Sequence, residues 1–286
     1  MEEKFASMPD ARRSRTPESD DAELARAVRR LIQLFVALGI LLVIGVVGLI
    51  VWLQRGQSGQ KLLDAVEKNQ PTVVAGLLNS GVDANVANED GVSALMLASY
   101  HDFKPIAENL LQHGAKVEVK NNRQETALRL AGSTHPDIVK LLLEHGADPN
   151  VRDFYGKTLL VSACEAGADR NPETLRLLLD HGADPNIGGD NGAPLLYAIN
   201  LGEHGNAEIV RLLLAHGAKP DAKDRTQTPA LMCAVDKHNV EIVKALIASK
   251  VNLNATDSLG HTSLKSAEDR QLTEIAALLK KAGGKE

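Results

Sequence analysis

One ten-residue phrase occurs three times in this chain, and a repeated phrase constrains the fold more than any single motif does. It reads LLLEHGADPN at 141–150, LLLDHGADPN at 177–186 and LLLAHGAKPD at 212–221. A catalytic site is needed once, so a phrase that recurs at a fixed period indicates a stack of similar structural units. The glycine of the phrase and its counterparts fall every 32 to 36 residues, at Gly81, Gly114, Gly146, Gly182, Gly217 and Gly283, with Lys250 in the sixth slot.

A second repeated phrase, rich in small residues, starts about 12 residues after each of these register positions. It reads TALRLAG at 126–132 and TLLVSAC at 158–164. We expect the opening threonines, Thr126, Thr158 and Thr228, to cap a helix by accepting hydrogen bonds from its first free N–H groups. The small residues that follow would let two helices pack closely against each other.

Each register glycine is preceded by a segment with the spacing of an amphipathic helix. In the third unit, Ile138, Leu141 and Leu142 recur at i, i+3 and i+4 and are expected to face the core. Gly146 would end this helix in a left-handed conformation that glycine adopts without strain. Lys250 would hold the same geometry at a cost of about 1 kcal/mol, which leaves open a different ending for the sixth unit.

The two phrases at this period resemble the ankyrin repeat, with its T-P-L-H-x-A-A and L-L-x-x-G-A-D-x-N segments. The resemblance covers roughly Gln60 to Gly283. It implies an all-α fold class, a solenoid of helix-turn-helix units with hairpin fingers, about seven units including caps, over residues 61–286. It also implies a binding module whose concave face, made of fingers and first helices, grips a protein partner.

A long apolar run precedes the repeats. From Leu34 to Leu53 the chain has 20 residues without a charged or amide side chain, about 30 Å of helix, which matches the hydrocarbon core of a bilayer. A cleaved signal peptide has a shorter apolar core and a shorter leader, and few soluble helices are apolar all round. We therefore expect a transmembrane helix at 31–53, followed by a flexible linker at 54–60.

Basic residues predict the orientation of that helix. Arginines are in excess on its N-terminal side, which predicts that residues 1–30 form a cytoplasmic tail. The alternating charges and two prolines of this tail predict that most of it is disordered, with a helix starting from about Asp21. The ankyrin-repeat domain would then be extracytoplasmic, and a bacterial inner-membrane protein with a periplasmic solenoid is the simplest host. The arginines are Arg12, Arg13, Arg15, Arg26, Arg29 and Arg30.

Several classes of function find no support in the sequence. The formal net charge of −5 provides no basic field for nucleic acid. Cys164 and Cys233 lie two repeats apart, too far for a disulfide, and are expected to be buried thiols. Asp148 and Asp184 are interpreted as turn formers. We expect no catalytic residues, no cofactor, no metal and no small-molecule substrate. Four histidines that share one slot are assigned to helix ends rather than to a metal ladder: His113, His145, His181 and His216.

The candidate binding surface comes from slots that vary between units while the structural slots stay nearly constant. One pair of slots lies just before the finger glycine and holds Phe154 and Tyr155 in one unit and Asp224 and Arg225 in another. Aromatic and arginine side chains dominate interface energetics, so exposed aromatics on a finger suggest a contact. The protein-binding residues expected on this basis are Tyr100, Arg123, Phe154, Tyr155, Glu165, Asp190 and Arg225.

Two alternatives stay open at this point. The aromatics of the finger could pack against the next finger, and the variation between units could be unconstrained drift. The chain could also be a structural or regulatory subunit of a larger membrane or enzyme complex, with the apolar helix as the interface. Gly39, Gly45 and Gly48 would permit close packing there, although they do not form a GxxxG motif.

Overall fold

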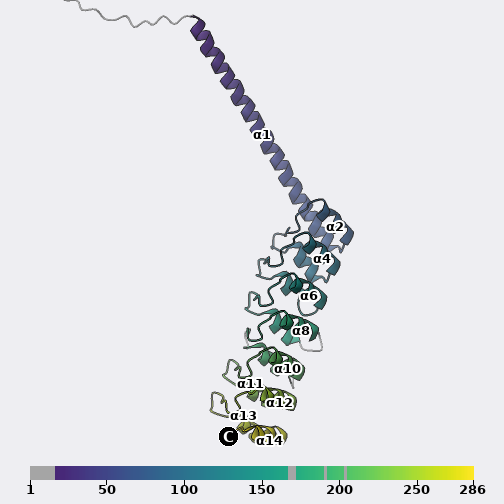
Figure 1. Cartoon of the computed structure of the whole chain (residues 1–286), viewed down its shortest axis with the longest axis vertical. Coiled ribbons are helices and arrows are strands. Elements are labelled where there is room, and N and C mark those ends of the chain that lie inside the picture. The colour runs from purple at the N-terminus through teal and green to yellow at the C-terminus, as the bar shows by residue number, and fades with distance from the viewer. Residues whose placement is uncertain (1–16, 167–171, 190–191, 203–204) are drawn as a thin grey trace, which may run out of the picture. The chain divides into compact units, whose positions relative to one another are not determined.

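The computed structural model describes residues 17–166, 172–189, 192–202 and 205–286, although some side chains between residues 17 and 55 are not described. The chain divides into two compact units, with the boundary between Gln57 and Ser58. Figure 1 shows the helices of both units.

The first unit contains most of a single long helix, α1 (Pro17–Glu67). Proline at the first position suits a helix start because its missing N–H would have no partner there. The apolar side chains described between Leu34 and Leu49 are exposed. Among the side chains that the structure describes, no helix offers a stretch long and apolar enough to cross a membrane.

The boundaries of α1 differ from the expected domain limits. The helix starts at Pro17, earlier than the start expected near Asp21, and residues 1–16 of the expected tail lie outside the described residues. The linker expected at 54–60 is helical as well. This segment has no proline, and its glutamines favour helix. Gly59 is buried beside Val86, and a Cβ at that position would lie 3.0 Å from Cγ1 of the valine.

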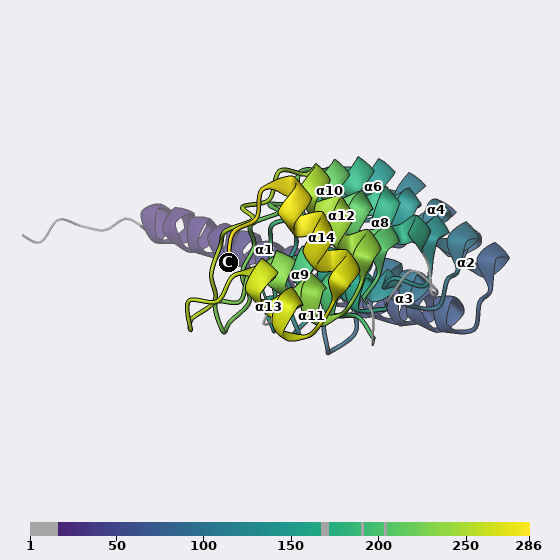
Figure 2. The same ribbon diagram turned by 90° about the horizontal axis from the view of Figure 1, so that it is seen from below.

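The second unit is an all-helical solenoid, as expected, with seven helix pairs among its described residues. Figure 2 shows the even-numbered outer helices stacked in one row beside the odd-numbered inner helices. The first pair joins the end of α1 to α2 (Pro71–Asn79). The others are α3 (Ala94–Tyr100) with α4 (Lys104–Gln112), α5 (Ala127–Ala131) with α6 (Pro136–Glu144), α7 (Leu159–Ala166) with α8 (Pro172–Asp180), α9 (Pro194–Asn200) with α10 (Ala207–Ala215), α11 (Ala230–Asp236) with α12 (Val240–Ala248), and α13 (Ser263–Asp269) with α14 (Thr273–Ala282).

The inner helices start at hydroxyl caps where the sequence allows it. Thr126 accepts a hydrogen bond from the N–H of Arg129, and Thr158 accepts one from the N–H of Val161. The expectation for Thr228 was wrong, because Pro229 is the N-cap of α11 and makes no side-chain cap. Pro229 follows Thr228 directly and occupies the N-cap position in its place. The helix therefore starts one residue later than expected.

The outer helices end in one common geometry. The N–H groups of Gly146 and Ala147 donate to the carbonyls of Leu143 and Leu142, both at 3.0 Å, and Gly146 has a φ of 84°. The sixth unit ends in the same way despite its lysine. Lys250 has a φ of 60°, and its N–H donates to a helix carbonyl at 3.0 Å. The strained conformation is therefore kept and the different ending left open by the sequence does not occur.

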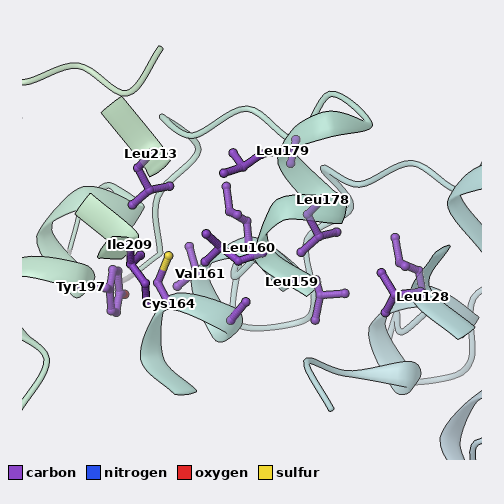
Figure 3. Packing of buried hydrophobic residues seen from close by; sticks show 14 of the residues in the cluster. Leu128, Leu159, Leu160, Val161, Cys164, Leu178, Leu179, Tyr197, Ile209 and Leu213 are labelled. Carbon is purple, nitrogen blue, oxygen red and sulfur yellow. The ribbon is translucent and has the colours of Figure 1, made fainter. Parts of the chain in front are cut away.

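The core runs continuously through the stack. Ile138, Leu141 and Leu142 are buried, which confirms the inward face assigned to the third unit. Small residues of the inner helices are buried between neighbouring units. Figure 3 shows buried side chains of α7 packed among those of α8 and α9. No unit buries its apolar face alone, so each one depends on its neighbours.

Polar side chains tie each unit to the next. The side chain of Asn150 donates to the carbonyl of Gly182 at 3.1 Å and accepts from the N–H of Asp184 at 2.8 Å. Asn186 makes the equivalent pair of bonds with the following unit. Asp148 and Asp184 each accept a hydrogen bond from the N–H two residues later. Their assignment as turn formers is confirmed. The repeated asparagine has a structural role, because its side chain hydrogen-bonds to the backbone of the next repeat.

Candidate protein-binding surface

The fingers carry a structural slot that the sequence interpretation did not identify. An Asp or Asn in each of five fingers accepts hydrogen bonds through Oδ1 from the N–H groups two and four residues later, and a residue with positive φ follows it by three positions. This slot places Asp224 among the turn formers, so the variable pair of that finger is Arg225 and Thr226. The five residues are Asn88, Asn121, Asp153, Asp224 and Asp257.

Phe154 and Tyr155 extend from one finger into solvent. Their exposed fractions are 76% and 74%. The two rings contact each other edge to face, with centroids 5.6 Å apart. The pair therefore does not pack under the next finger. Exposed aromatic pairs of this kind are disfavoured in water and are suited to contact with another molecule.

The backbone beneath this aromatic pair is held firmly. Nε and Nη2 of Arg129, on α5, donate to Oδ2 of Asp153 at 3.3 and 3.0 Å. Burial opposes ionisation of Asp153, but backbone N–H groups and the Arg129 guanidinium together lower the pKa of this carboxyl. The side chain of Asp153 is 7% exposed. The finger that presents the aromatics is thus fixed by a mostly buried ion pair between neighbouring units.

Tyr100 and Arg123 line one hollow on the surface formed by the fingers and inner helices, which we call the finger face. This hollow 1 has a volume of ≈ 310 Å³, and its lining also includes Asp90, Met96 and Leu130. The side chain of Tyr100 is 59% exposed. The two residues come from successive units and meet as the repeat register predicts.

Glu165 and Arg225 line a second hollow on the finger face. This hollow 2 has a volume of ≈ 520 Å³, and its lining includes Leu196 and Tyr197. Glu165 accepts a hydrogen bond from Nζ of Lys157 at 2.8 Å. Asp190, the remaining residue expected in the site, lies outside the described residues.

The sequence interpretation missed a third hollow, and it did not select one exposed side chain of the variable slots as a binding residue. Hollow 3 has a volume of ≈ 270 Å³ and is lined by residues that include Met232, Asp236, Asp257 and Asp269. Leu259, on a finger tip, is 77% exposed. Leu259 falls in the same variable slot as Tyr155, and that slot was the signal that could have identified it.

The outer helices present a different surface. Some of their exposed charges pair across neighbouring units, although such exposed pairs contribute little to stability. Among the residues with described burial, Val73 on α2 is 46% exposed, whereas α4 and the outer helices that follow it expose no large hydrophobic residue. The pairs are Lys104–Asp137 at 3.2 Å, Arg176–Glu208 at 2.9 Å and Arg211–Glu241 at 3.7 Å.

The repeated histidines and the cysteines have structural surroundings. His145 and His216 each place Nδ1 within 2.9 Å of the carbonyl four residues earlier, at the C-terminus of an outer helix. His181 does the same at 2.8 Å. Cys164 and Cys233 are buried free thiols. Burial raises the pKa of the Cys233 thiol to about 12 and also raises that of Cys164.

A stack of helix pairs with variable, solvent-facing fingers defines a repeat-built module of the class that presents an extended binding surface. The family profile described as ankyrin repeats (3 copies) matches residues 62–153, 152–224 and 195–285. The chain therefore belongs to the ankyrin-repeat family. Ankyrin repeats are protein–protein interaction modules and are generally non-enzymatic.

Similar proteins share the repeats with this chain. NF-kappa-B inhibitor alpha of Sus scrofa is 43% identical over 84 residues, which cover 28% of this chain and 27% of the relative. The E3 ubiquitin-protein ligase hecd-1 of Caenorhabditis elegans is 34% identical over 111 residues, covering 38% of this chain and 4% of the ligase. The chain thus spans about a quarter or less of these two relatives.

Solved structures show the same fold. An ankyrin repeat domain from Acinetobacter baumannii has a TM-score of 0.60 at 28% identity and covers 67% of this chain and 98% of that domain. The ankyrin repeat domain of Bcl-3, a member of the IkappaB protein family, has a TM-score of 0.65 at 26% identity, with coverages of 77% and 97%. Both similarities concern the solenoid.

Proposed function

We propose that this protein is a membrane-anchored, non-enzymatic scaffold that binds a protein partner through its finger face. The anchor would be the apolar run from Leu34 to Leu53, and the binding residues would be those that line hollows 1 and 2 or project from the finger between them. The solenoid would present this surface close to the membrane.

The observation that carries the binding proposal is the contrast between the two faces. Phe154, Tyr155 and Leu259 expose large hydrophobic side chains on finger tips, whereas the outer helices carry charges that pair with one another. A partner that covers the aromatics gains from removing apolar surface from water. The outer helices offer a partner less exposed apolar surface, and some of their charges are already paired. The finger face is therefore the favoured interface.

Photo-crosslinking tests the binding face directly. A photoreactive phenylalanine analogue would be placed at Tyr155 in the full-length chain and, as a matched control, at the exposed Lys140 on α6. We expect a crosslinked protein partner from position 155 and none from position 140. The reverse pattern would place the interface on the outer helices and refute the proposal.

Membrane anchoring and its orientation require separate experiments. The absence of charge from Leu34 to Leu53 supports insertion, and the arginine excess before it supports a cytoplasmic N-terminus with an extracytoplasmic, in bacteria periplasmic, solenoid. Carbonate extraction of membranes should leave the full chain in the pellet. Reporters fused after residue 286 should be active only outside the cytoplasm. An active cytoplasmic reporter would invert the orientation and leave the scaffold on the other side.

The alternative of a subunit in a larger membrane complex predicts a different crosslinking pattern. The side chain of Leu42 is 70% exposed on α1. The same analogue at Leu42 should capture lipid or nothing if the helix is an anchor. Crosslinks to membrane proteins from position 42, without any from position 155, would favour the alternative.

A further inference from the structure

One unit of the solenoid already shows how its finger face holds a guanidinium group. The third residue of α5 is Arg129, and its side chain reaches Asp153 in the finger that follows, with two N–H groups on Oδ2 at 3.0 and 3.3 Å. Oδ1 of Asp153 meanwhile accepts the N–H groups of Tyr155 and Lys157. One carboxylate thus both closes the finger turn and binds an arginine.

Two other units repeat this arrangement without the arginine. The third residue of α9 is Leu196, and the finger that follows presents Asp224; the third residue of α11 is Met232, and its finger presents Asp257. Hollows 2 and 3 lie at these two places, with volumes of ≈ 520 and ≈ 270 Å³. In the unit of α5, Arg129 stands at the equivalent position, and its guanidinium group already binds the carboxylate of Asp153.

Hollow 2 has the chemistry that a long cationic side chain requires. The backbone bonds to Asp224 and the hydroxyl bond from Thr226 all fall on Oδ1, which leaves Oδ2 for a further donor. Glu165 provides a second carboxylate, which Nζ of Lys157 already contacts at 2.8 Å, and Leu196 and Tyr197 provide apolar surface. An arginine packs its stem against such a surface and donates several N–H groups to carboxylates. Arg225 lies on the same rim.

Hollow 3 has a similar composition one unit further along. Met232 provides apolar surface, and its carboxylates are Asp236, Asp257 and Asp269. Arg270 pairs with Asp236 at 2.9 Å and Lys265 pairs with Asp269 at 2.7 Å. His261 lies 3.5 Å from Oδ2 of Asp257. The three carboxylates of hollow 3 outnumber the lysine and the arginine that pair with two of them, so Asp257 is the one that a cation from outside would use.

We propose that hollows 2 and 3 bind two arginine side chains of the protein partner, with Asp224 and Asp257 as their carboxylate acceptors. This inference rests on the proposed function of the finger face. Neighbouring units lie roughly 10 Å apart, as packed helices do. An extended chain advances about 3.3 Å per residue, so the partner segment is extended and carries arginines at positions i and i+3.

The experiment uses model peptides and the full-length chain purified in a non-ionic detergent. The probe is a fluorescently labelled peptide with the core Arg-Ala-Ala-Arg between Gly-Ser flanks, and its binding is followed by anisotropy. Companion peptides carry Glu-Ala-Ala-Glu, or the two arginines side by side. We expect measurable binding of the first peptide, weaker binding of the adjacent-arginine peptide, and none of the glutamate peptide.

Two conservative variants identify the acceptors. Asp224→Asn and Asp257→Asn keep the Oδ1 acceptor, because asparagine occupies the same slot natively at Asn88 and Asn121. Each removes the charge and replaces the acceptor Oδ2 with an amide NH₂ group, so it should weaken binding of the Arg-Ala-Ala-Arg peptide roughly tenfold, since charge-assisted hydrogen bonds are the stronger ones. The control is Asp184→Asn, at a turn whose slot holds a native Asn252 in a later unit, and it should bind as the unmodified chain does.

The outcomes separate the two proposals. Failure of the peptide to bind at millimolar concentration, equal binding of the glutamate peptide, or no effect of either aspartate variant would overturn the arginine hollows. If Tyr155 still crosslinks to the natural partner in that case, the proposed function stands and the partner uses other chemistry. If crosslinking moves to the outer helices, the proposed function itself has failed.

Discussion

Lys250 holds a backbone conformation that every comparable unit gives to glycine, and its replacement tests the account of the helix ends. In the left-handed region an L side chain costs about 1–2 kcal/mol. The Lys250 side chain is exposed, so little is lost with it. Glycine has more conformational freedom than lysine in the unfolded chain, and this reduces the stability gained from relieving the strain by about 0.5–1 kcal/mol. Lys250→Gly should therefore stabilise the solenoid by about 0.5–1 kcal/mol.

The assay for this variant is urea unfolding of the full-length chain, followed by circular dichroism, with hydrogen exchange to locate the change. Because stability in a stack is local, protection should rise in α12 and α14 and stay constant in α4. Lys244→Gly, within the helical part of α12, is the control and should destabilise by about 1 kcal/mol. A Lys250→Gly variant that is less stable than the native chain would refute the strain argument.

Three further predictions follow from the core, the ion pair and the thiols. Leu142→Ala should lower the free energy of unfolding by about 2–5 kcal/mol, whereas His145→Ala at the exposed helix end should cost far less, as urea unfolding would show; equal losses would contradict the assigned face. The lowered pKa of Asp153 means that its contribution to stability is complete above its ordinary pKa near ~3.9 and is lost as the pH falls through the lowered value. The acid limb of the stability profile should therefore be shallower in Asp153→Asn, and an unchanged limb would contradict this. Burial and raised pKa values predict that Cys164 and Cys233 react with iodoacetamide only after unfolding, and rapid labelling of the native chain at pH 8 would show that the thiols are accessible.

The sequence predicts this fold well because its structural slots are local. A glycine in a left-handed turn or a threonine before a helix acts within a few residues, so the period could be read without tertiary information. Thr228 failed because two residues competed for one cap slot, and only the helix start at Ala230 shows that Pro229 occupies it. The way the helix ends at Lys250 was left open. The sequence alone gives the strain of the lysine, but it does not show that the hydrogen bond from its N–H to the helix is kept.

The candidate site was less predictable, because it depends on contacts between units. The exposure of Phe154 and Tyr155 was one of two possibilities in the sequence, and their surroundings in the structure decide it. The hollows require two residues from successive units, such as Leu196 and Asp224, together with the absence of a long side chain between them. No single repeat contains that information. The pairing of Arg129 with Asp153 is visible only when the finger is placed beside the helix before it.

Fold stability and binding chemistry occupy different atoms of the same finger, which lets one change without the other. Phe154 and Tyr155 are mostly exposed, so replacing their rings should change stability by no more than about 0.5 kcal/mol. Their backbone is held instead by Oδ1 of Asp153, which bonds the N–H groups of Tyr155 and Lys157. The aspartate slot must therefore be kept for the turn, while the tip beside it is free to take whatever side chain a partner selects. Where this slot holds an aspartate, it also supplies a second carboxylate oxygen. The turn of such a finger therefore becomes, where no arginine of the chain fills it, a receptor for a cation from outside.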